Sequence, residues 1–256
     1  MKFPLTSIHQ IEMTSRCNLR CRYCVHPKMA RAKIDMDEAT FVRSLMWVST
    51  FVRRGTQGEL NLAGIGESTM HPEFVRYVHL AREALGWGRA LVLATNGLLM
   101  TDELAQAIAP SKIMVWVSLH RPEKAGPAVE ALRRAGILAG VSADPSISAI
   151  DWAGQVQWHV SVPERRQCPW VKGGWCVVLA DGRVSRCCFD GSGIGVLGTV
   201  HDDLPSVETS PYALCRTCDQ DVGVPFPVAE QPKEEEPHAD PQGFRWLPDA
   251  ASHEPA

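Results

Sequence analysis

The chain reads Cys17-Asn18-Leu19-Arg20-Cys21-Arg22-Tyr23-Cys24 directly after its first apolar segment, residues 7–13. This run places three thiols within eight residues, at the carboxyl end of a predicted strand. Three thiolates on one loop can hold three irons of a cubane iron–sulfur cluster and leave the fourth iron open to a ligand that is not protein. Zinc is the alternative, because it prefers a fourth protein ligand and His26 is close enough in sequence to supply one.

Outward from this run, the chain alternates short apolar segments with amphipathic segments as far as residue 162. The predicted strands are 7–13, 59–63, 90–95, 112–118, 137–142 and 158–162. Strands that alternate with helices build a parallel sheet, and about six units are too few to close an eight-stranded barrel. The sequence therefore predicts an α/β fold, a partial (β/α)6 barrel of the TIM type.

The first predicted helix follows the cysteine run and has the clearest signals. Asp35 is its predicted N-cap, Glu38 follows three residues later, and Gly55 marks its end. Pro72 and Pro127 are expected near the starts of later helices. These later helices are predicted at 72–85, 101–109 and 126–135.

Beyond residue 163 the alternation stops, and three regions follow from the pattern. Residues 1–163 form the barrel, 164–225 a small cysteine-rich C-terminal domain, and 226–256 a disordered tail rich in Pro and Glu. The middle region contains a predicted hairpin with its turn at Asp181-Gly182. It has so little apolar mass that we expect a metal centre to hold it together.

Composition excludes several classes of protein. The net charge is −3, and the tail carries seven acids against two bases, which leaves the first 225 residues at +2 and argues against a strongly basic nucleic-acid-binding domain. The chain has neither an apolar run of 18 residues nor a secretory start, so we expect a cytoplasmic protein without a membrane span. Nine cysteines in a reducing compartment point first to metal binding.

The cysteine run, with an aromatic residue before its last cysteine, resembles the radical S-adenosylmethionine (radical SAM) superfamily. The resemblance implies that Cys17, Cys21 and Cys24 bind a [4Fe–4S] cluster and that Tyr23 lies against the adenine of S-adenosyl-L-methionine (SAM). In that family, SAM binds the open iron and is cleaved reductively to a 5′-deoxyadenosyl radical, which abstracts hydrogen from the substrate.

A second resemblance lies at Gly64-Ile65-Gly66-Glu67, after the strand at 59–63. The run is similar to the family's glycine-glycine-glutamate motif, which binds the methionine end of SAM. Gly66 would let the backbone approach a ligand closely, and Glu67 would accept a hydrogen bond from an ammonium group. This copy departs from the pattern at Ile65 and Ser68, where the family has glycine and proline.

Further candidates stand at other strand ends. Asn96 and Ser118 look like family positions that line the SAM pocket, although a turn and a plain strand serine are the alternatives. His120 and Arg121 follow Ser118 and are weak candidates for contact with substrate. The general base is unknown, and Glu12, His120 and His159 are candidates by position alone.

The remaining cysteines form a second set. It resembles the SPASM or shortened Twitch domain that follows the barrel in some radical SAM enzymes and binds an auxiliary [4Fe–4S] cluster. The resemblance implies four ligands and two spare thiols, Cys176 and Cys188, with the choice between Cys187 and Cys188 open. Structural zinc is the alternative. The implied ligands are Cys168, Cys187, Cys215 and Cys218.

The expected activity is oxidation of a small polar substrate, because small Twitch enzymes resemble the aminocyclitol alcohol dehydrogenases and a fully ligated cluster suits electron uptake. The alternatives are a peptide maturase that forms crosslinks, a radical epimerase or isomerase acting on a modified nucleotide, and a non-catalytic zinc-binding module. The peptide reading ranks lower because the first strand begins so early that we expect no leader-binding module before it.

A basic stretch around the cysteine run predicts a partner. It would attract an acidic flavodoxin or ferredoxin that delivers electrons, although an anionic substrate or a solvated face are alternatives. Its cations are Arg16, Arg20, Arg22, Lys28, Arg31 and Lys33.

Overall fold

An eight-stranded mixed sheet forms the centre of the computed structural model, in the order β6-β5-β4-β3-β2-β7-β8-β9. The structure describes residues 2–53, 58–142, 152–156, 168–202 and 208–218, all of them in the first of two compact units, Met1–Val224. The predicted strand at 158–162, the predicted boundary at residue 163 and the predicted tail lie outside the described residues.

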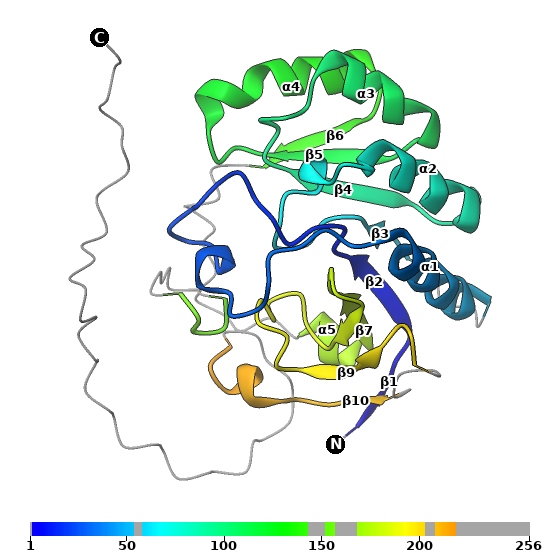
Figure 1. Ribbon diagram of the computed structural model, residues 1–256, viewed down its shortest axis with the longest axis vertical. Helices are drawn as coiled ribbons and strands as arrows, with labels where there is room; N and C mark the ends of the chain where they lie inside the picture. Colours follow the sequence, from blue (N-terminus) through cyan, green and yellow to red (C-terminus); the bar gives the residue numbers. More distant parts are fainter. Residues whose placement is uncertain (1, 54–57, 143–151, 157–167, 203–207, 219–256) are drawn as a thin grey trace. The chain divides into compact units, whose positions relative to one another are not determined.

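Within the residues that the structure describes, five parallel strands and four helices build the barrel part, which confirms the expected α/β fold. The strands are β2 (Ser7–Ile11), β3 (Leu60–Asn61), β4 (Leu91–Thr95), β5 (Met114–Ser118) and β6 (Leu138–Ser142). The helices are α1 (Glu38–Arg53), α2 (Phe74–Leu85), α3 (Asp102–Ile108) and α4 (Pro122–Arg134). Figure 1 shows these helices along one side of the sheet. None of the described helices is long and apolar enough to cross a membrane.

The described residues also contain short 3₁₀ helices. They span His26–Lys28, Ser68–Met70, Ala109–Ser111 and Ala213–Arg216. The last of them carries Cys215, and the first follows the cysteine run directly.

The start of α1 differs from the prediction. Asp37 and not Asp35 caps the helix, because its carboxylate accepts from the amide and hydroxyl of Thr40 at 2.8 and 2.9 Å. These bonds hold the pKa of Asp37 below its usual value. Asp35 instead receives hydrogen bonds from Thr14 and Arg16, at the base of the cysteine loop. The predicted stop at Gly55 lies outside the described residues.

The start of α4 also differs. The helix begins at Pro122, four residues before the predicted start, and Pro127 lies inside it. Pro122 occupies the first turn, where its missing N–H costs nothing. The predicted helix ends are confirmed at Gly86 and Gly136, which adopt φ of +59° and +69°.

The cysteine-rich stretch continues the main sheet. Strand β7 (Trp175–Val178) pairs parallel to β2, and β8 (Arg183–Ser185) and β9 (Val196–Thr199) follow antiparallel. The predicted hairpin is confirmed, with Val178 opposite Val184 and Gly182 at φ +81°. Apolar residues of this stretch share the core of the barrel, so the expectation that it has too little apolar mass for a hydrophobic core is wrong. These core residues are Cys176, Val178, Val184 and Val200.

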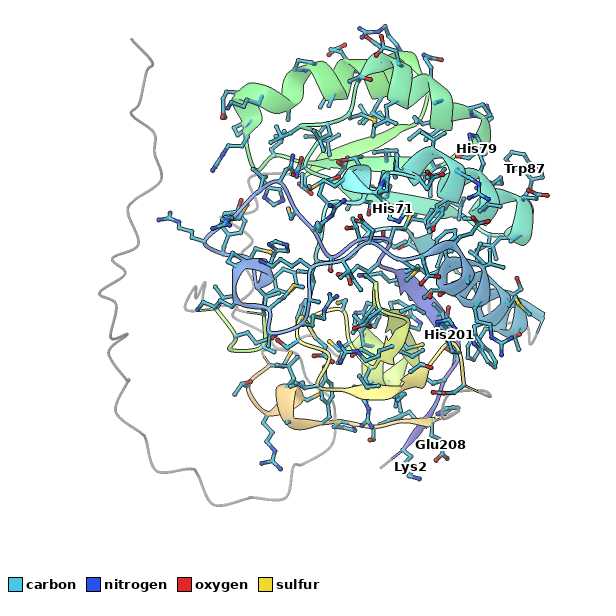
Figure 2. The ribbon with its side chains drawn as sticks, viewed as in Figure 1. Lys2, His71, His79, Trp87, His201 and Glu208 are labelled. Atoms are coloured by element: carbon cyan, nitrogen blue, oxygen red, sulfur yellow. The ribbon has the colours of Figure 1, made fainter. Side chains whose placement is uncertain are left out.

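A second, two-stranded sheet joins the start of the chain to the segment before Cys215. Strand β1 (Phe3–Pro4) pairs antiparallel with β10 (Glu208–Thr209). The side chains of Lys2 and Glu208, labelled together in Figure 2, form an ion pair at 3.1 Å. The segment that carries Cys215 is thereby tied to the N-terminal segment.

Candidate active site

The loop that carries the three cysteines is closed at its base by hydrogen bonds between its two ends. Thr14 Oγ1 donates to Asp35 Oδ1 at 2.7 Å, and the Ser15 amide donates to the Ile34 carbonyl at 2.9 Å. The Ile34 amide in turn donates to Ser15 Oγ at 2.8 Å. The three cysteines therefore lie on a closed loop that follows β2, visible in blue in Figure 1.

A cavity of about 280 Å³ lies between this loop and the ends of β3, β4 and β5. All three cysteines line it, together with every predicted SAM-binding residue and one candidate for substrate contact. Its lining is Cys17, Leu19, Cys21, Tyr23, Cys24, His26, Ala63, Gly64, Ile65, Gly66, Glu67, Ala94, Thr95, Asn96, Ser118, His120 and Trp152.

The thiols of this loop are partly buried. Burial raises the pKa of Cys17, and it raises the pKa of Cys24 to about 11. Backbone amides oppose this effect, since Leu19 N donates to Cys17 Sγ and His26 N donates to Cys24 Sγ, each at 3.4 Å. Because metals bind thiolates, metal binding at this loop must displace protons.

The zinc alternative would take His26 as its fourth ligand. Its Nε2 lies 3.0 Å from the Ser15 carbonyl oxygen, which can only accept, so Nε2 carries the proton. Burial lowers the pKa of His26, which favours the neutral ring. The neutral ring then presents Nδ1 as an acceptor.

Gly64 and Gly66 pack against the protein backbone and side chains that follow β2. A Cβ on Gly66 would lie 2.2 Å from the Thr14 carbonyl oxygen, and a Cβ on Gly64 would lie 2.3 Å from Glu12 Cγ. Only glycine permits these approaches. The close approach that the sequence assigned to a ligand is therefore, for Gly66, an approach to the base of the cysteine loop.

Glu67 joins three segments around the cavity. Its Oε1 accepts from Thr95 Oγ1 and Thr69 Oγ1, both at 2.7 Å, and its Oε2 accepts from Asn96 N at 2.8 Å. Its own amide donates to the Arg16 carbonyl at 2.7 Å. Glu67 thus fastens the loop after β3 to the end of β4 and to the cysteine loop, and its contact with an ammonium group stays a prediction.

The other predicted cavity residues also contact one another. Asn96 Nδ2 donates to Asn18 Oδ1 at 2.7 Å, which ties the end of β4 to the cysteine loop. Tyr23 Oη lies 2.7 Å from His120 Nδ1, and the two rings stack with centroids 5.7 Å apart. Ser118 ends β5 on the same cavity wall. The structure thus brings Tyr23, Asn96, Ser118 and His120 together.

Glu12, a candidate for the general base by position alone, does not line this cavity. Its carboxylate is buried, with an exposed side-chain fraction of 1 %, and both oxygens lie 2.7 Å from Arg31 Nη2. The amides of Ile65 and Ala180 donate to its two oxygens, each at 3.1 Å. Arg31 also donates to the Gly191 carbonyl at 2.6 Å. Glu12 is therefore a structural anchor.

The last two candidates lie elsewhere. Arg121 is not among the residues that line the cavity, and its Nη1 donates to the His120 carbonyl at 3.2 Å. His159 lies outside the described residues.

A second cavity gathers the four predicted auxiliary ligands from three segments of the chain. Its lining is Ala153, Cys168, Val171, Cys187, Tyr212, Leu214, Cys215 and Cys218. Burial raises the pKa of Cys168, and it raises that of Cys215 to about 11. In the described ranges, no three His, Cys, Asp or Glu side chains are grouped closely enough to hold a single metal ion.

Cys187 and the two predicted spare thiols, Cys188 and Cys176, differ in their surroundings. Cys187 lines the second cavity and Cys188 does not. A hydrogen bond between these two lowers the pKa of Cys187 and raises that of Cys188. Cys176 lies in the core, where its Sγ contacts the Ser7 carbonyl at 3.4 Å and burial raises its pKa to about 12. Cys176 therefore lines neither cavity, as expected for a spare thiol.

Asp190 organises the loop after Cys187 and Cys188, and sequence reasoning missed it. The side chain is fully buried; its Oδ2 accepts from Ser185 Oγ at 2.5 Å and from Gly195 N at 2.7 Å, and its Oδ1 accepts from Ile194 N at 2.9 Å. An aspartate that comes directly before a glycine-rich run is the sequence pattern that could have predicted this loop.

Trp152 was also missed, although it lines the first cavity. Its Nε1 donates to the Tyr23 carbonyl at 2.8 Å. No periodicity or motif marks the sequence around it, so only the tertiary structure shows its place.

The basic stretch is smaller than predicted. Arg16 forms an ion pair with Asp35 at 2.6 Å, and Arg31 is buried against Glu12, so two of the six cations face carboxylates. The four others have exposed side chains close to the cysteine loop in sequence: Arg20, Arg22, Lys28 and Lys33.

Comparison with known proteins agrees with this geometry. Residues 11–162, more than half of the chain, match the family model described as Radical SAM superfamily. The chain belongs to the radical SAM superfamily. Membership makes this protein a radical SAM enzyme and implies a [4Fe–4S] cluster and SAM.

A curated relative of this radical SAM protein is the tungsten-containing aldehyde ferredoxin oxidoreductase cofactor-modifying protein of Pyrococcus furiosus. The two are 32 % identical over 150 residues, which cover 58 % of this chain and 40 % of the relative. The match thus spans less than half of that protein.

Solved structures share the fold. BtrN in complex with AdoMet and 2-DOIA has a TM-score of 0.64 and 20 % identity, over 78 % of this chain and 80 % of BtrN. Native anSMEcpe with bound AdoMet and Cp18Cys peptide has a TM-score of 0.54 and 16 % identity, over 78 % of this chain and 79 % of the other. At these identities the likeness extends to the fold alone.

The donor set of the first cavity fits the cofactors that the family implies. Three cysteines line it, and they come from one closed loop. The lining also includes Asn96 and Ser118, and the segment from Gly64 to Gly66, whose side-chain and backbone groups can hydrogen-bond a polar ligand.

Proposed function

We propose that this radical SAM enzyme oxidises a small polar substrate and uses a second [4Fe–4S] cluster as electron acceptor. The observation that carries the proposal is the separation of the cysteines into two cavities, three at one and four at the other. Three thiolates leave one iron of a cubane open for SAM, whereas four thiolates complete the coordination of a second cubane.

Cys17, Cys21 and Cys24 would hold the first cluster. The backbone from Gly64 to Gly66 and the side chains of Asn96 and Ser118 would orient SAM. Tyr23 would lie against the adenine, held in place by its hydrogen bond to His120 at 2.7 Å.

The second cavity would hold the auxiliary cluster on Cys168, Cys187, Cys215 and Cys218. When bound, the first cluster and SAM supply a hydrogen-abstracting 5′-deoxyadenosyl radical, and the auxiliary cluster supplies a one-electron acceptor. The chain's part is to hold the target carbon and to keep water away from it.

Two further features support the proposal. The polar side chain of His120 on the wall of the first cavity favours a small polar substrate over an apolar one. The exposed cations Arg20, Arg22, Lys28 and Lys33 favour an acidic flavodoxin or ferredoxin as the reductant.

Iron analysis and SAM cleavage test the proposal directly. Protein reconstituted anaerobically with iron and sulfide is expected to be brown and to hold about eight irons per chain. With dithionite and SAM it should release 5′-deoxyadenosine and methionine in equal amounts. Colourless, zinc-rich protein that leaves SAM intact would instead favour a zinc-binding module.

The substrate itself can be found with a deuterated pool of candidates, by following deuterium into 5′-deoxyadenosine with mass spectrometry. Transfer from a small polar compound supports the proposal. Transfer from a peptide or a modified nucleotide would replace the small-substrate part of it.

Cys218→Ala tests the auxiliary site. The variant is expected to lose about half of its iron while it still cleaves SAM at saturating SAM concentration, because the first cavity keeps its three thiols. With the substrate present, net oxidation should stop. Full turnover by this variant would remove the electron-acceptor role, and unchanged iron content would remove Cys218 as a ligand.

A further inference from the structure

Residues 152–156, here called the strap, have an unusual backbone. Trp152, Ala153 and Gly154 adopt successive φ values of +54°, +60° and +81°. The left-handed region is costly for a residue with a side chain, at about 1 kcal/mol or more each for tryptophan and alanine. Such a conformation persists only where surrounding contacts enforce it. The contacts of the strap must therefore hold its backbone in this conformation.

On one side the strap contacts the loop of the first cavity. The Trp152 ring lines that cavity, and its Nε1–H donates to the Tyr23 carbonyl, the residue before Cys24, at 2.8 Å. Val156 packs with Val25 and Ile65 in a small apolar cluster, against which Cys24 and Trp152 also pack.

On the other side the strap contacts the segments of the second cavity. Ala153 lines that cavity, and its carbonyl accepts from Thr217 Oγ1 at 2.5 Å. Thr217 lies between Cys215 and Cys218. A Cβ on Gly154 would lie 3.0 Å from Thr217 Cβ, so the backbone at Gly154 packs closely against the Thr217 side chain.

A further pair of contacts involves Phe189, which follows Cys187 and Cys188. The Trp152 and Phe189 rings meet edge to face with centroids 5.5 Å apart. Gln155 Nε2 donates to the carbonyls of Trp152 and Phe189 at 2.6 and 2.8 Å. Through five residues, the strap therefore joins the loop of the first cavity to two of the segments that bear the second set of cysteines.

We propose that Trp152 is a positioning residue, through which the ordered second cavity holds the first cavity in its SAM-binding shape. This inference rests on the proposed function and deepens it. A substitution at Thr217, which does not line the first cavity, must then weaken SAM binding there. By linkage, SAM must also stabilise the second site to the same degree.

Two variants and their combination test the proposal. Trp152→Phe keeps an aromatic ring beside Phe189 but removes the N–H donor to Tyr23. Thr217→Val removes the hydroxyl that donates to Ala153. Each is expected to weaken SAM binding about fivefold, the value of one neutral hydrogen bond. Because both substitutions act through one strap, the double variant should also bind SAM about fivefold more weakly than wild type. Its loss of affinity should not be the product of the two single losses.

The readout is the dissociation constant of SAM on the anaerobic, iron-loaded protein, measured by equilibrium dialysis with iron content determined on the same samples. Trp47→Phe is the matched control, because Trp47 Nε1 also donates to a backbone carbonyl, that of Val200, at 3.1 Å and lines neither cavity. Thr50→Val is the control for the threonine, since its hydroxyl donates to the Met46 carbonyl within α1 at 3.0 Å.

The outcomes separate the two proposals. Wild-type protein that binds no SAM would overturn the proposed function. If wild type binds SAM and Thr217→Val binds it equally well with full iron, the role of the strap is overturned. If Thr217→Val loses iron, a second variant, Gln155→Leu, tests the inference, because Gln155 lies on neither cysteine loop. Gln155→Leu must weaken SAM binding while it keeps its full iron content. If it does not, the inference fails.

Discussion

Cys21→Ala is expected to abolish SAM cleavage. The three thiols at the first cavity all come from one loop, and the variant leaves two of them for a cluster that needs three. Loss of a residue that merely orients a metal ligand costs about 10–100-fold in affinity or activity, so loss of a ligand itself should cost more than about 100-fold. The measurement is 5′-deoxyadenosine formed with dithionite, together with iron per chain.

Cys176→Ala is the matched control for this variant. It also removes one thiol, but a buried one in the core of the sheet and away from both cavities. The control should keep its iron and its SAM cleavage. If Cys21→Ala cleaved SAM as fast as the control, the first cavity would not be the SAM site.

Glu12→Gln is expected to destabilise the protein by about 3–5 kcal/mol, because it leaves the buried Arg31 without its charge partner. The Arg31 side chain is only 3 % exposed, so water cannot replace the lost carboxylate. The effect should also be local. Glu12 accepts from the amides of Ile65 and Ala180, and these amides should exchange hydrogen faster in the variant.

Urea unfolding followed anaerobically, with hydrogen exchange read by mass spectrometry, measures both effects. Glu38→Gln is the control, since it breaks an ion pair with Arg76 whose side chains are about half exposed, and such pairs are worth about 0–1 kcal/mol. Equal urea midpoints of unfolding for the two variants would show that the Glu12–Arg31 pair does not stabilise the fold. A folded, stable Glu12→Gln protein that fails in catalysis alone would return Glu12 to the catalytic candidates.

The sequence was most informative where local spacing controls chemistry. The three cysteines of the run are close in the chain, so any closed loop after β2 brings them to one place. The alternation of strands and helices likewise predicts a parallel sheet, because parallel neighbours need a crossover between them. In such a sheet the strand ends meet at one edge, and this is why Asn96 and Ser118 could be assigned to the same cavity as the cysteines.

Helix starts were less predictable. Asp35 and Asp37 are equally good capping residues by type, and the choice between them was made by a distant partner. Asp35 accepts hydrogen bonds from Thr14 and Arg16, and Asp37 caps α1 instead.

The sequence by itself thus determined the α/β class, the cysteine loop and the placement of Tyr23, Asn96 and Ser118 at the same cavity, since these depend on contacts that short spacing or sheet geometry dictates. Only the tertiary structure decided that β7 joins β2 in the main sheet, that Glu12 is buried against Arg31, and that Trp152 lies between the two sets of cysteines. Each of these depends on segments more than a dozen residues apart, and the free energy that pairs such segments comes from burial and charge contacts that leave no periodic signal along the chain.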